Sequence, residues 1–168
     1  MRGAVLVAAA AGALGVVALA RPGVAAVRAG QRAEDFELKD LSGRAVRLSG
    51  LRGKVVLLDF WASWCEPCKK ELPILGEMAK RLRTHGIEVL TVNLDKSRSN
   101  AETFLRAHGV QLTVLLNPEQ TVAEKYEPPK MPSSYVIDKK GLVRFVNAGF
   151  ESGDEKKIEQ QLLDLASK

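Results

Sequence analysis

Short hydrophobic runs and helically spaced hydrophobic positions alternate along most of the chain. Residues 54–60 (KVVLLDF) are apolar almost throughout, a pattern typical of a central strand covered on both faces. Similar runs at 87–94 and 112–116 predict two more strands. From Glu66 to about Thr84, leucine and methionine residues recur at the spacing of one helical face. This alternation predicts strands of one sheet that are joined by helices.

Two pairs of short segments predict β-hairpins. Residues 36–38 and 46–48 flank a turn-like Asp-Leu-Ser-Gly sequence ahead of the central strand. Residues 134–137 and 142–147 flank an Asp-Lys-Lys-Gly turn near the end of the chain. We therefore expect a small hairpin in front of the main sheet and a second hairpin at the edge of that sheet.

Three further helices are expected. Residues 99–102 (SNAE) have the form of a capping box that opens a helix to about His108. Residues 117–118 (NP) are expected to start a short helix through about Tyr126, and residues 152–155 (SGDE) to cap a final amphipathic helix. After the first hairpin the predicted order is βαβαβαββα, which is a mixed α/β domain.

The N-terminal segment differs from the rest of the chain. An uncharged run of 17 residues, Ala4 to Ala20, follows an early arginine, as in export signals. Residues 18–20 (ALA) have the small-x-small form of a signal-peptidase site, while the length of the run is also at the lower limit for a membrane-spanning helix. We expect a cleaved signal or an uncleaved anchor at 1–20, a linker at 21–30 and one folded domain at 31–168.

Composition and charge narrow the classes of function. With 46% hydrophobic and 27% charged residues, the chain can bury a core of its own. The formal charge of +5 comes from lysine and arginine residues that are interleaved with acids instead of forming a block. The charge pattern is that of a solvated surface, and it argues against a nucleic-acid partner.

The two cysteines of the sequence, Cys65 and Cys68, lie in the motif CEPC directly after the central strand and at the start of a helix. Free backbone N–H groups and the helix dipole at such a place stabilise a thiolate, which favours Cys65 as the attacking sulfur. The spacing lets Cys68, which is expected to be the more buried, displace a substrate thiol from a mixed disulfide. Pro67 suits the first helical turn. A zinc site would need a second pair of Cys or His ligands, and none is suitably spaced. Covalent haem attachment would need a histidine directly after the second cysteine, where this chain has Lys69.

The stretch KVVLLDFWASWCEPCKKELP at 54–73, together with MPSSYVID at 131–138, resembles the TlpA/ResA group of bacterial extracytoplasmic thioredoxin-like proteins. The resemblance extends from about Gln31 to the C-terminus. It implies a thioredoxin-like α/β fold with an N-terminal β-hairpin and an extra helix, here 101–108, inserted after the second central strand. It also implies a thiol-disulfide oxidoreductase with no cofactor other than its dithiol, acting outside the cytoplasm and often in cytochrome c maturation.

Several site residues follow from this resemblance. Pro132 matches the family's cis-proline, which faces the cysteines and, with Met131, pairs with an extended substrate chain. Asp59 matches the buried acid beneath the second cysteine, where burial raises its pKa until it exchanges protons with Cys68. The alternative is a partly hydrated, inert acid at the strand end. Glu71 matches a second acid of the ResA-like proteins, although a solvated helix face would explain it nearly as well.

Aromatic and charged residues around the motif complete the expected site. Trp64, with Glu66 and Pro67 between the cysteines, is expected to contact substrate. Trp61 matches the second aromatic at the border of the site, but packing explains it equally well. The lysine that thioredoxins place near the buried acid is missing, and Thr91 stands at about its position, so the proton route need not copy that of thioredoxin. Lys69 is expected to point into solvent.

The direction of electron flow is less clear from the residues. The leading hypothesis is a reductase that acts on a disulfide-containing protein and is reduced again by a membrane thiol carrier of the DsbD/CcdA type. Negative charge from Glu66, Asp59 and Glu71 disfavours a thiolate, which predicts a reducing couple. An oxidase or isomerase would use the same cysteines. A thiol peroxidase would want a hydroxyl residue at Ala62, and a non-catalytic binding module would not need the intact motif.

Overall fold

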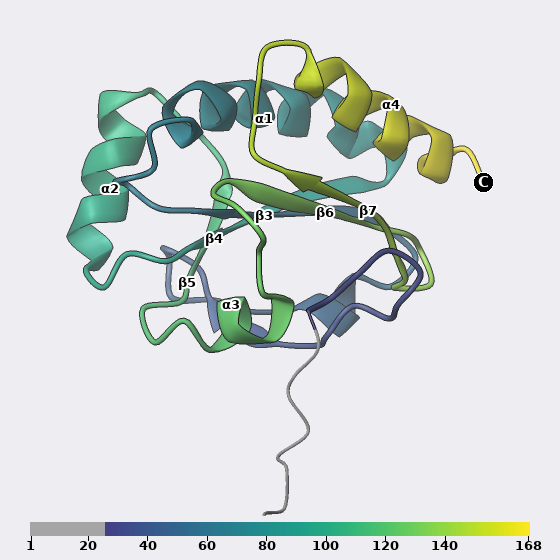
Figure 1. The fold of residues 1–168 in the computed structure, drawn as a ribbon, viewed down its shortest axis with the longest axis horizontal. Helices are drawn as coiled ribbons and strands as arrows, with labels where there is room; N and C mark the ends of the chain where they lie inside the picture. Colours follow the sequence, from purple (N-terminus) through teal and green to yellow (C-terminus); the bar gives the residue numbers. More distant parts are fainter. Residues whose placement is uncertain (1–25) are drawn as a thin grey trace, which may run out of the picture.

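The computed structural model describes residues 26–168 (Figure 1). A five-stranded sheet forms its centre, and a two-stranded hairpin forms a second, separate sheet beside it. The hairpin consists of β1 (Glu37–Lys39) and β2 (Ala45–Arg47). The sheet consists of β3 (Val55–Trp61), β4 (Ile87–Asn93), β5 (Thr113–Leu116), β6 (Ser133–Ile137) and β7 (Val143–Ala148).

Helices connect these strands. They are α1 (Cys68–Leu82), α2 (Arg98–Ala107), α3 (Thr121–Tyr126) and α4 (Asp154–Ala166), with short 3-10 turns at Leu48–Leu51 and Arg83–His85. From β3 onward the order is βαβαβαββα, as the sequence predicts. Among the described residues, no helix is long and apolar enough to cross a membrane. The predicted signal or anchor at 1–20 lies outside the described residues.

The strand order in the sheet is β5-β4-β3-β6-β7. Strands β3, β4 and β5 are parallel, whereas β6 pairs antiparallel with both β3 and β7. β3 is therefore the central strand, and all seven of its residues are buried. This burial on both faces explains why its sequence is a continuous apolar run without alternation.

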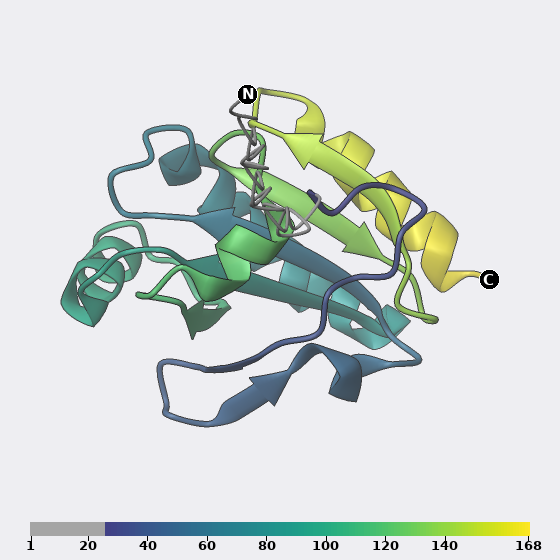
Figure 2. The same cartoon turned by 60° about the horizontal axis from the view of Figure 1, so that its bottom comes forward.

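Helices cover both faces of the sheet (Figure 1). Helices α1 and α4 lie on one face, with α2 beside α1, and α3 lies on the opposite face with the N-terminal segment. Figure 2 shows the segment that contains β1 and β2 running across the face that also carries α3. Val27 is buried in this second layer and donates its N–H to the carbonyl of Tyr126, so packing reaches back into the predicted linker.

The alternation of side chains along β3 decides what can lie beneath the cysteines. Val55, Leu57 and Trp61 belong to the core that contains α1 and α4, whereas Val56, Leu58 and Phe60 belong to the other core. Because successive side chains of a strand point to opposite faces, Asp59 projects toward α1. The same core contains both cysteines.

Helix starts are where the structure departs from the predictions. Helix α1 begins at Cys68 instead of Glu66. The capping box at 99–102 is wrong, because α2 begins at Arg98 and no side chain caps it. Helix α3 begins at Thr121, later than the predicted start at 117–118. In each case the start depends on which backbone N–H groups other segments leave free, which a local motif does not report.

The last helix also begins differently from the capping pattern predicted for 152–155. Gly153 precedes α4 in a left-handed conformation and contributes no capping side chain. Instead, the carboxyl groups of Asp154 and Glu155 accept hydrogen bonds from the backbone N–H groups of Glu151 and Gly153. The acids of the first turn thus accept hydrogen bonds from the preceding loop, and the predicted capping role of Ser152 is not what starts the helix.

Candidate active site

Cys65 and Cys68 form a disulfide with an S–S distance of 1.99 Å and a Cα–Cα distance of 5.4 Å. Cys65 lies in the loop after β3, and Cys68 is the first residue of α1. The side chains are 3% and 0% exposed, respectively. The prediction that Cys68 is the more deeply placed sulfur agrees with this order.

Backbone hydrogen bonds shape the loop between β3 and α1. The N–H of Cys65 donates to the carbonyl of Ala62 at 3.1 Å, which closes a tight turn. The N–H of Lys69 donates to Glu66, and those of Lys70 and Glu71 donate to the carbonyl of Pro67. Because Cys65 precedes the helix, the positive end of the α1 dipole favours its thiolate form.

Two buried carboxyl groups lie on the dithiol side of the sheet. Asp59 is 0% exposed on β3, and Glu71 is 1% exposed in the first turn of α1. Three carboxyl oxygens of this pair have no hydrogen-bond partner among residues 26–168: both oxygens of Asp59 and Oε2 of Glu71. The structure therefore brings together the two acids named from the sequence, and neither of them lies on a solvated face.

Burial dominates the electrostatics of this acid pair. Loss of hydration, followed by the charge of Glu71, raises the pKa of Asp59 well above its ordinary range. Loss of hydration, followed by the charge of Asp154, raises the pKa of Glu71 to about 8. Glu71 is predominantly protonated at neutral pH, and burial favours the protonated form of Asp59 in the same direction, so each can donate a proton to a thiolate formed nearby.

The charged residues next to the cysteines differ from the expectation. Lys69 forms an ion pair with Glu66 instead of pointing freely into solvent. The hydrogen bond and charge of Lys69 lower the pKa of Glu66. Glu66 is therefore an ionised acid whose charge is largely balanced by its neighbour, and it disfavours a thiolate at Cys65 less than an unpaired acid would.

The Met131–Pro132 peptide bond is cis, as the resemblance implies. Pro132 is buried, and its carbonyl accepts a hydrogen bond of 2.7 Å from the N–H of Gly149. The Ser133 hydroxyl donates to the carbonyl of Lys130, which holds the loop before the proline. A substrate-pairing role for Met131 and Pro132 remains a prediction.

The two tryptophans have different environments. Trp64 is 66% exposed directly before Cys65, where a bound protein would meet it. Trp61 is fully buried, and its ring packs against Phe104 of α2 with centroids 5.0 Å apart. Of the two interpretations of Trp61, packing is the one that fits its burial.

Thr91 lies opposite Asp59 in the parallel pairing of β3 and β4, at the position expected from the sequence. Its hydroxyl donates to the carbonyl of Thr113 on β5 at 3.3 Å. On the other side of Asp59, β6 places Ser134 in register. The surroundings of Asp59 thus contain hydroxyl groups in place of the lysine of thioredoxins.

A polar cluster next to the motif has no counterpart in the sequence predictions. Asp95, just beyond β4, is buried and accepts hydrogen bonds from Ser63 and Asn93. Ser63 belongs to the loop that leads into Cys65. The signal that could have revealed it is position, because functional groups gather beyond the carboxyl ends of parallel strands.

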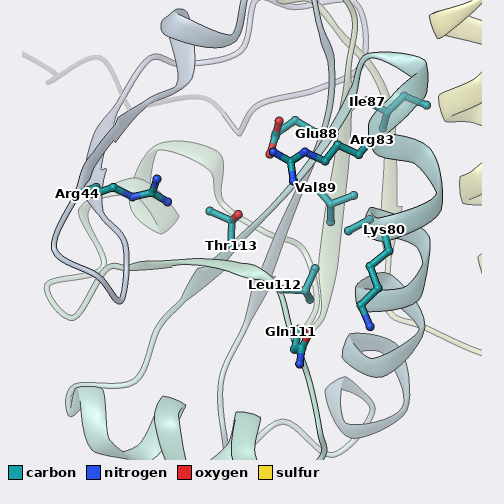
Figure 3. Close-up of a pocket in the computed structure, with 10 residues that line it drawn as sticks. Arg44, Lys80, Arg83, Ile87, Glu88, Val89, Gln111, Leu112 and Thr113 are labelled. Atoms are coloured by element: carbon teal, nitrogen blue, oxygen red, sulfur yellow. The ribbon is translucent and has the colours of Figure 1, made fainter.

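One pocket lies away from the dithiol. Figure 3 shows a pocket at the opposite end of α1, between the end of this helix, β4 and the start of β5, with Lys80, Arg83 and Glu88 on its wall. None of the proposed site residues lines this pocket. In the part of the chain that the structure describes, no three His, Cys, Asp or Glu side chains gather as a metal site would require.

Comparison with known proteins agrees with this arrangement of the dithiol. The model of the AhpC/TSA family matches residues 29–146. The chain is 35% identical over 127 residues to the thiol-disulfide oxidoreductase ResA of Bacillus subtilis (strain 168), which covers 76% of this chain and 71% of that protein. The chain belongs to the AhpC/TSA family. Within this family it is a ResA-like thiol-disulfide oxidoreductase.

Solved structures confirm the thioredoxin-like fold of this family member. A candidate thiol:disulfide interchange protein DsbE from Chlorobium tepidum is 36% identical, with a TM-score of 0.79, and the match covers 84% of this chain and 99% of that chain. A candidate protein disulfide isomerase from Bacteroides thetaiotaomicron is 26% identical, with a TM-score of 0.78, over 84% of this chain and 92% of that chain.

Proposed function

We propose that this oxidoreductase is exported and reduces disulfides of other proteins, with cytochrome c maturation as its setting. The observation that carries the proposal is the asymmetry of the dithiol. Cys65 is 3% exposed and directly follows the exposed Trp64, whereas Cys68 is 0% exposed and opens α1, whose first turn carries the buried Glu71. This difference supports Cys65 as the sulfur that meets a partner and Cys68 as the sulfur that exchanges protons inside the protein.

The reaction runs in two exchange steps. The Cys65 thiolate attacks one sulfur of the substrate disulfide, a mixed disulfide forms, and the first substrate sulfur leaves as a thiolate. The Cys68 thiolate then attacks the sulfur of Cys65, the Cys65–Cys68 disulfide forms, and the second substrate sulfur leaves. Two electrons pass to the substrate, whose two thiolates take up protons.

In this proposal Asp59 and Glu71 exchange protons with the thiol of Cys68. A buried thiol has to lose its proton before it can attack, and water has no access to Cys68. Once a carboxyl group of the pair has released its own proton, it can accept that of Cys68. Because burial raises the pKa of Glu71 to about 8, the exchange can occur near neutral pH.

The cycle needs an external source of electrons. The proposed reductant is a membrane thiol carrier of the DsbD/CcdA type, which would attack the Cys65–Cys68 disulfide and leave the dithiol. The sequence from Ala4 to Ala20 supports export, either as a cleaved signal or as an anchor. Fractionation of the native host tests this part, and full-length protein in the cytosol would contradict export.

A disulfide isomerase is the second candidate. It is supported by the structural match to a candidate isomerase at 26% identity, and the same two cysteines would serve it. Refolding of scrambled ribonuclease separates the two functions. A reductase accelerates insulin reduction but restores little ribonuclease activity, whereas an isomerase restores it efficiently.

Trapping tests the proposed roles directly. A Cys68→Ser variant expressed in the native host should retain its substrate as a mixed disulfide at Cys65, because the resolving sulfur is absent. Mass spectrometry of the purified complex names the substrate. The Cys65→Ser variant is the matched control, and it should trap nothing and should not reduce insulin. Equal trapping by both variants would refute the assignment of Cys65 as the attacking sulfur.

A further inference from the structure

Asp95 connects the end of β4 to the loop that carries the motif. One of its carboxyl oxygens accepts a 2.7 Å hydrogen bond from the Ser63 hydroxyl. The other accepts from the Ser63 backbone N–H at 2.9 Å and from the Asn93 side-chain amide at 2.7 Å. The N–H of Asp95 in turn donates to Oδ1 of Asn93. Three hydrogen bonds to its carboxylate and one from its backbone N–H thus fix this buried residue, and two of the four involve Ser63.

This contact belongs to a chain of bonds between β4 and the loop. The N–H of Leu94 donates to the carbonyl of Trp61 at 3.0 Å, and the N–H of Asn117 donates to the carbonyl of Asn93. Asn93 is itself 0% exposed. Asp95 therefore extends from a strand end that is itself held by hydrogen bonds. Along the loop, the carbonyls of Trp61 and Ala62 accept backbone hydrogen bonds, Ser63 follows them, and the exposed Trp64 comes next.

We infer that Asp95 is a positioning residue of the dithiol: by holding both donors of Ser63, it keeps the loop in the conformation in which Cys65 lies within bonding distance of Cys68. The inference concerns the dithiol chemistry and does not rest on the proposed reductase direction.

The physical reason is preorganisation. Forming an internal disulfide requires the two sulfurs to be held together, and any freedom of the loop lowers their effective concentration for each other. The backbone N–H of Cys65 donates to the carbonyl of Ala62, and the rest of the segment from Ser63 to Cys65 depends on what holds Ser63. Without Asp95 the Ser63 N–H and hydroxyl would turn to water, and the loop would gain conformations in which the sulfurs are apart.

Two substitutions weaken this contact by different amounts. Asp95→Asn keeps the size of the side chain but removes its charge and one of its two accepting oxygens, so the hydrogen bonds with Ser63 and Asn93 are weakened and cannot all keep their present direction. Ser63→Ala removes the hydroxyl bond and keeps the N–H bond. Ser63 is only partly buried, so this second variant should fold even if the first does not.

The chain offers a matched control in Asp40. It is 5% exposed, as is Asp95, and it likewise accepts hydrogen bonds from the backbone N–H and the hydroxyl of a serine, Ser42. It lies in the turn between β1 and β2, away from the motif. Asp40→Asn therefore perturbs a comparable serine contact, together with an ion pair to Arg44, without touching the dithiol.

The experiment equilibrates each purified variant with glutathione buffers, in which the protein dithiol and oxidised glutathione yield the protein disulfide and two reduced glutathione molecules. Asp95→Asn should lower the equilibrium constant for disulfide formation about tenfold, and Ser63→Ala by a smaller factor. The two effects should be less than additive in the double variant because they act through one contact. Thermal unfolding of the oxidised and reduced forms is recorded alongside.

A purely structural Asp95 would stabilise the reduced and oxidised forms equally. It would therefore lower both melting temperatures and leave the glutathione equilibrium within twofold of the wild type. That result in Asp95→Asn and Ser63→Ala, or an equal shift in Asp40→Asn, overturns the inference. Failure of the wild type to exchange with glutathione at all would instead count against the proposed function.

Discussion

At the scale of single residues, the buried acids Asp59 and Glu71 couple the stability of the protein to pH. The ordinary pKa of a glutamic acid is 4.5, and burial raises that of Glu71 to about 8 in the folded protein. Between these two values the unfolded chain releases the proton while the folded protein keeps it. Stability then falls as pH rises, by about 1.4 kcal/mol per pH unit for one such group.

We therefore predict that the oxidised protein is most stable near pH 5 and loses stability up to about pH 8. Glu71 sets an upper bound of about 5 kcal/mol on its own share of the loss. Glu71→Gln keeps the size and stays neutral, so it should remove most of this slope and be more stable than the wild type at pH 8.5. Asp59→Asn should also flatten the curve, because the pKa of Asp59 is raised in the same direction.

Urea unfolding at a series of pH values measures these slopes. Glu77→Gln is the control on the same helix, because the Glu77 side chain is 70% exposed and pairs with Lys80 at the surface. Its curve should run parallel to that of the wild type. If the Glu71 and Asp59 variants also run parallel to the wild type, neither carboxyl is held protonated by burial.

The two cysteines should differ in reactivity once the disulfide is reduced. Cys65 precedes the N-terminus of α1 and keeps the small solvent exposure of the pair, while Cys68 is fully buried. We predict that iodoacetamide alkylates Cys65 at least about tenfold faster than Cys68 at pH 7, because the thiolate is the reacting form and has to be reached. Peptide mapping after timed quenching gives both rates. Equal rates would contradict the assignment of roles.

At the scale of elements, the start of a helix depends on which side chain accepts hydrogen bonds from its first free N–H groups. Asn117 illustrates this: its side-chain oxygen accepts hydrogen bonds from the N–H groups of Val122 and Ala123, at 3.1 and 3.3 Å, five and six residues ahead. The sequence predicted a helix start at Asn117 itself, and the structure shows this residue capping a helix that begins later. Strands were predicted more closely, because burial on both faces leaves an apolar run in the sequence.

Removing a helix cap that the structure shows should lower the free energy of unfolding, whereas removing a predicted cap that the structure does not show should leave it nearly unchanged. We predict that Asn117→Ala lowers the free energy of unfolding by about 2 kcal/mol, because two backbone N–H groups lose their buried acceptor. Ser99→Ala, at the position of the wrong capping box, should change it by less than about 0.5 kcal/mol. Urea unfolding of both variants decides. A larger loss for Ser99→Ala would restore the sequence-based assignment of the α2 cap.

At the scale of the whole molecule, the site combines one local motif with residues from distant strands. The sequence predicted the motif, the cis-proline and the acid pair because a family resemblance and an apolar strand made them visible. It did not predict that Asp95 binds Ser63, 32 residues earlier in the chain. Nor did it predict the pairing of Lys69 with Glu66, because two charged side chains that are close in sequence can either form an ion pair or stay separately hydrated. Contacts of this kind arise only when the sheet is assembled.

The balance of charges around the dithiol sets its reduction potential. A couple becomes strongly oxidising when the attacking thiolate is greatly stabilised. Here Lys69 is engaged by Glu66, and Lys70 is exposed, so neither brings an unpaired buried cation to Cys65. Burial favours the protonated form of both acids, and Glu71, whose pKa is raised to about 8, gains negative charge only as pH rises toward that value. The α1 dipole remains as the main stabilising influence, which makes Cys65 moderately acidic.

We therefore predict a reducing couple with a potential at or below about −250 mV, closer to the −270 mV scale of thioredoxin than to the −120 mV scale of DsbA. Equilibration of the wild-type protein with defined thiol/disulfide buffers at pH 7 gives the value. Lys69→Met removes the partner of Glu66, so the unpaired acid should disfavour the Cys65 thiolate and make the couple still more reducing. Lys80→Met, which breaks a comparable ion pair with Glu77 at the far end of α1, should leave the potential unchanged. A wild-type value above about −180 mV, the scale of protein disulfide isomerase, would favour the isomerase over the reductase.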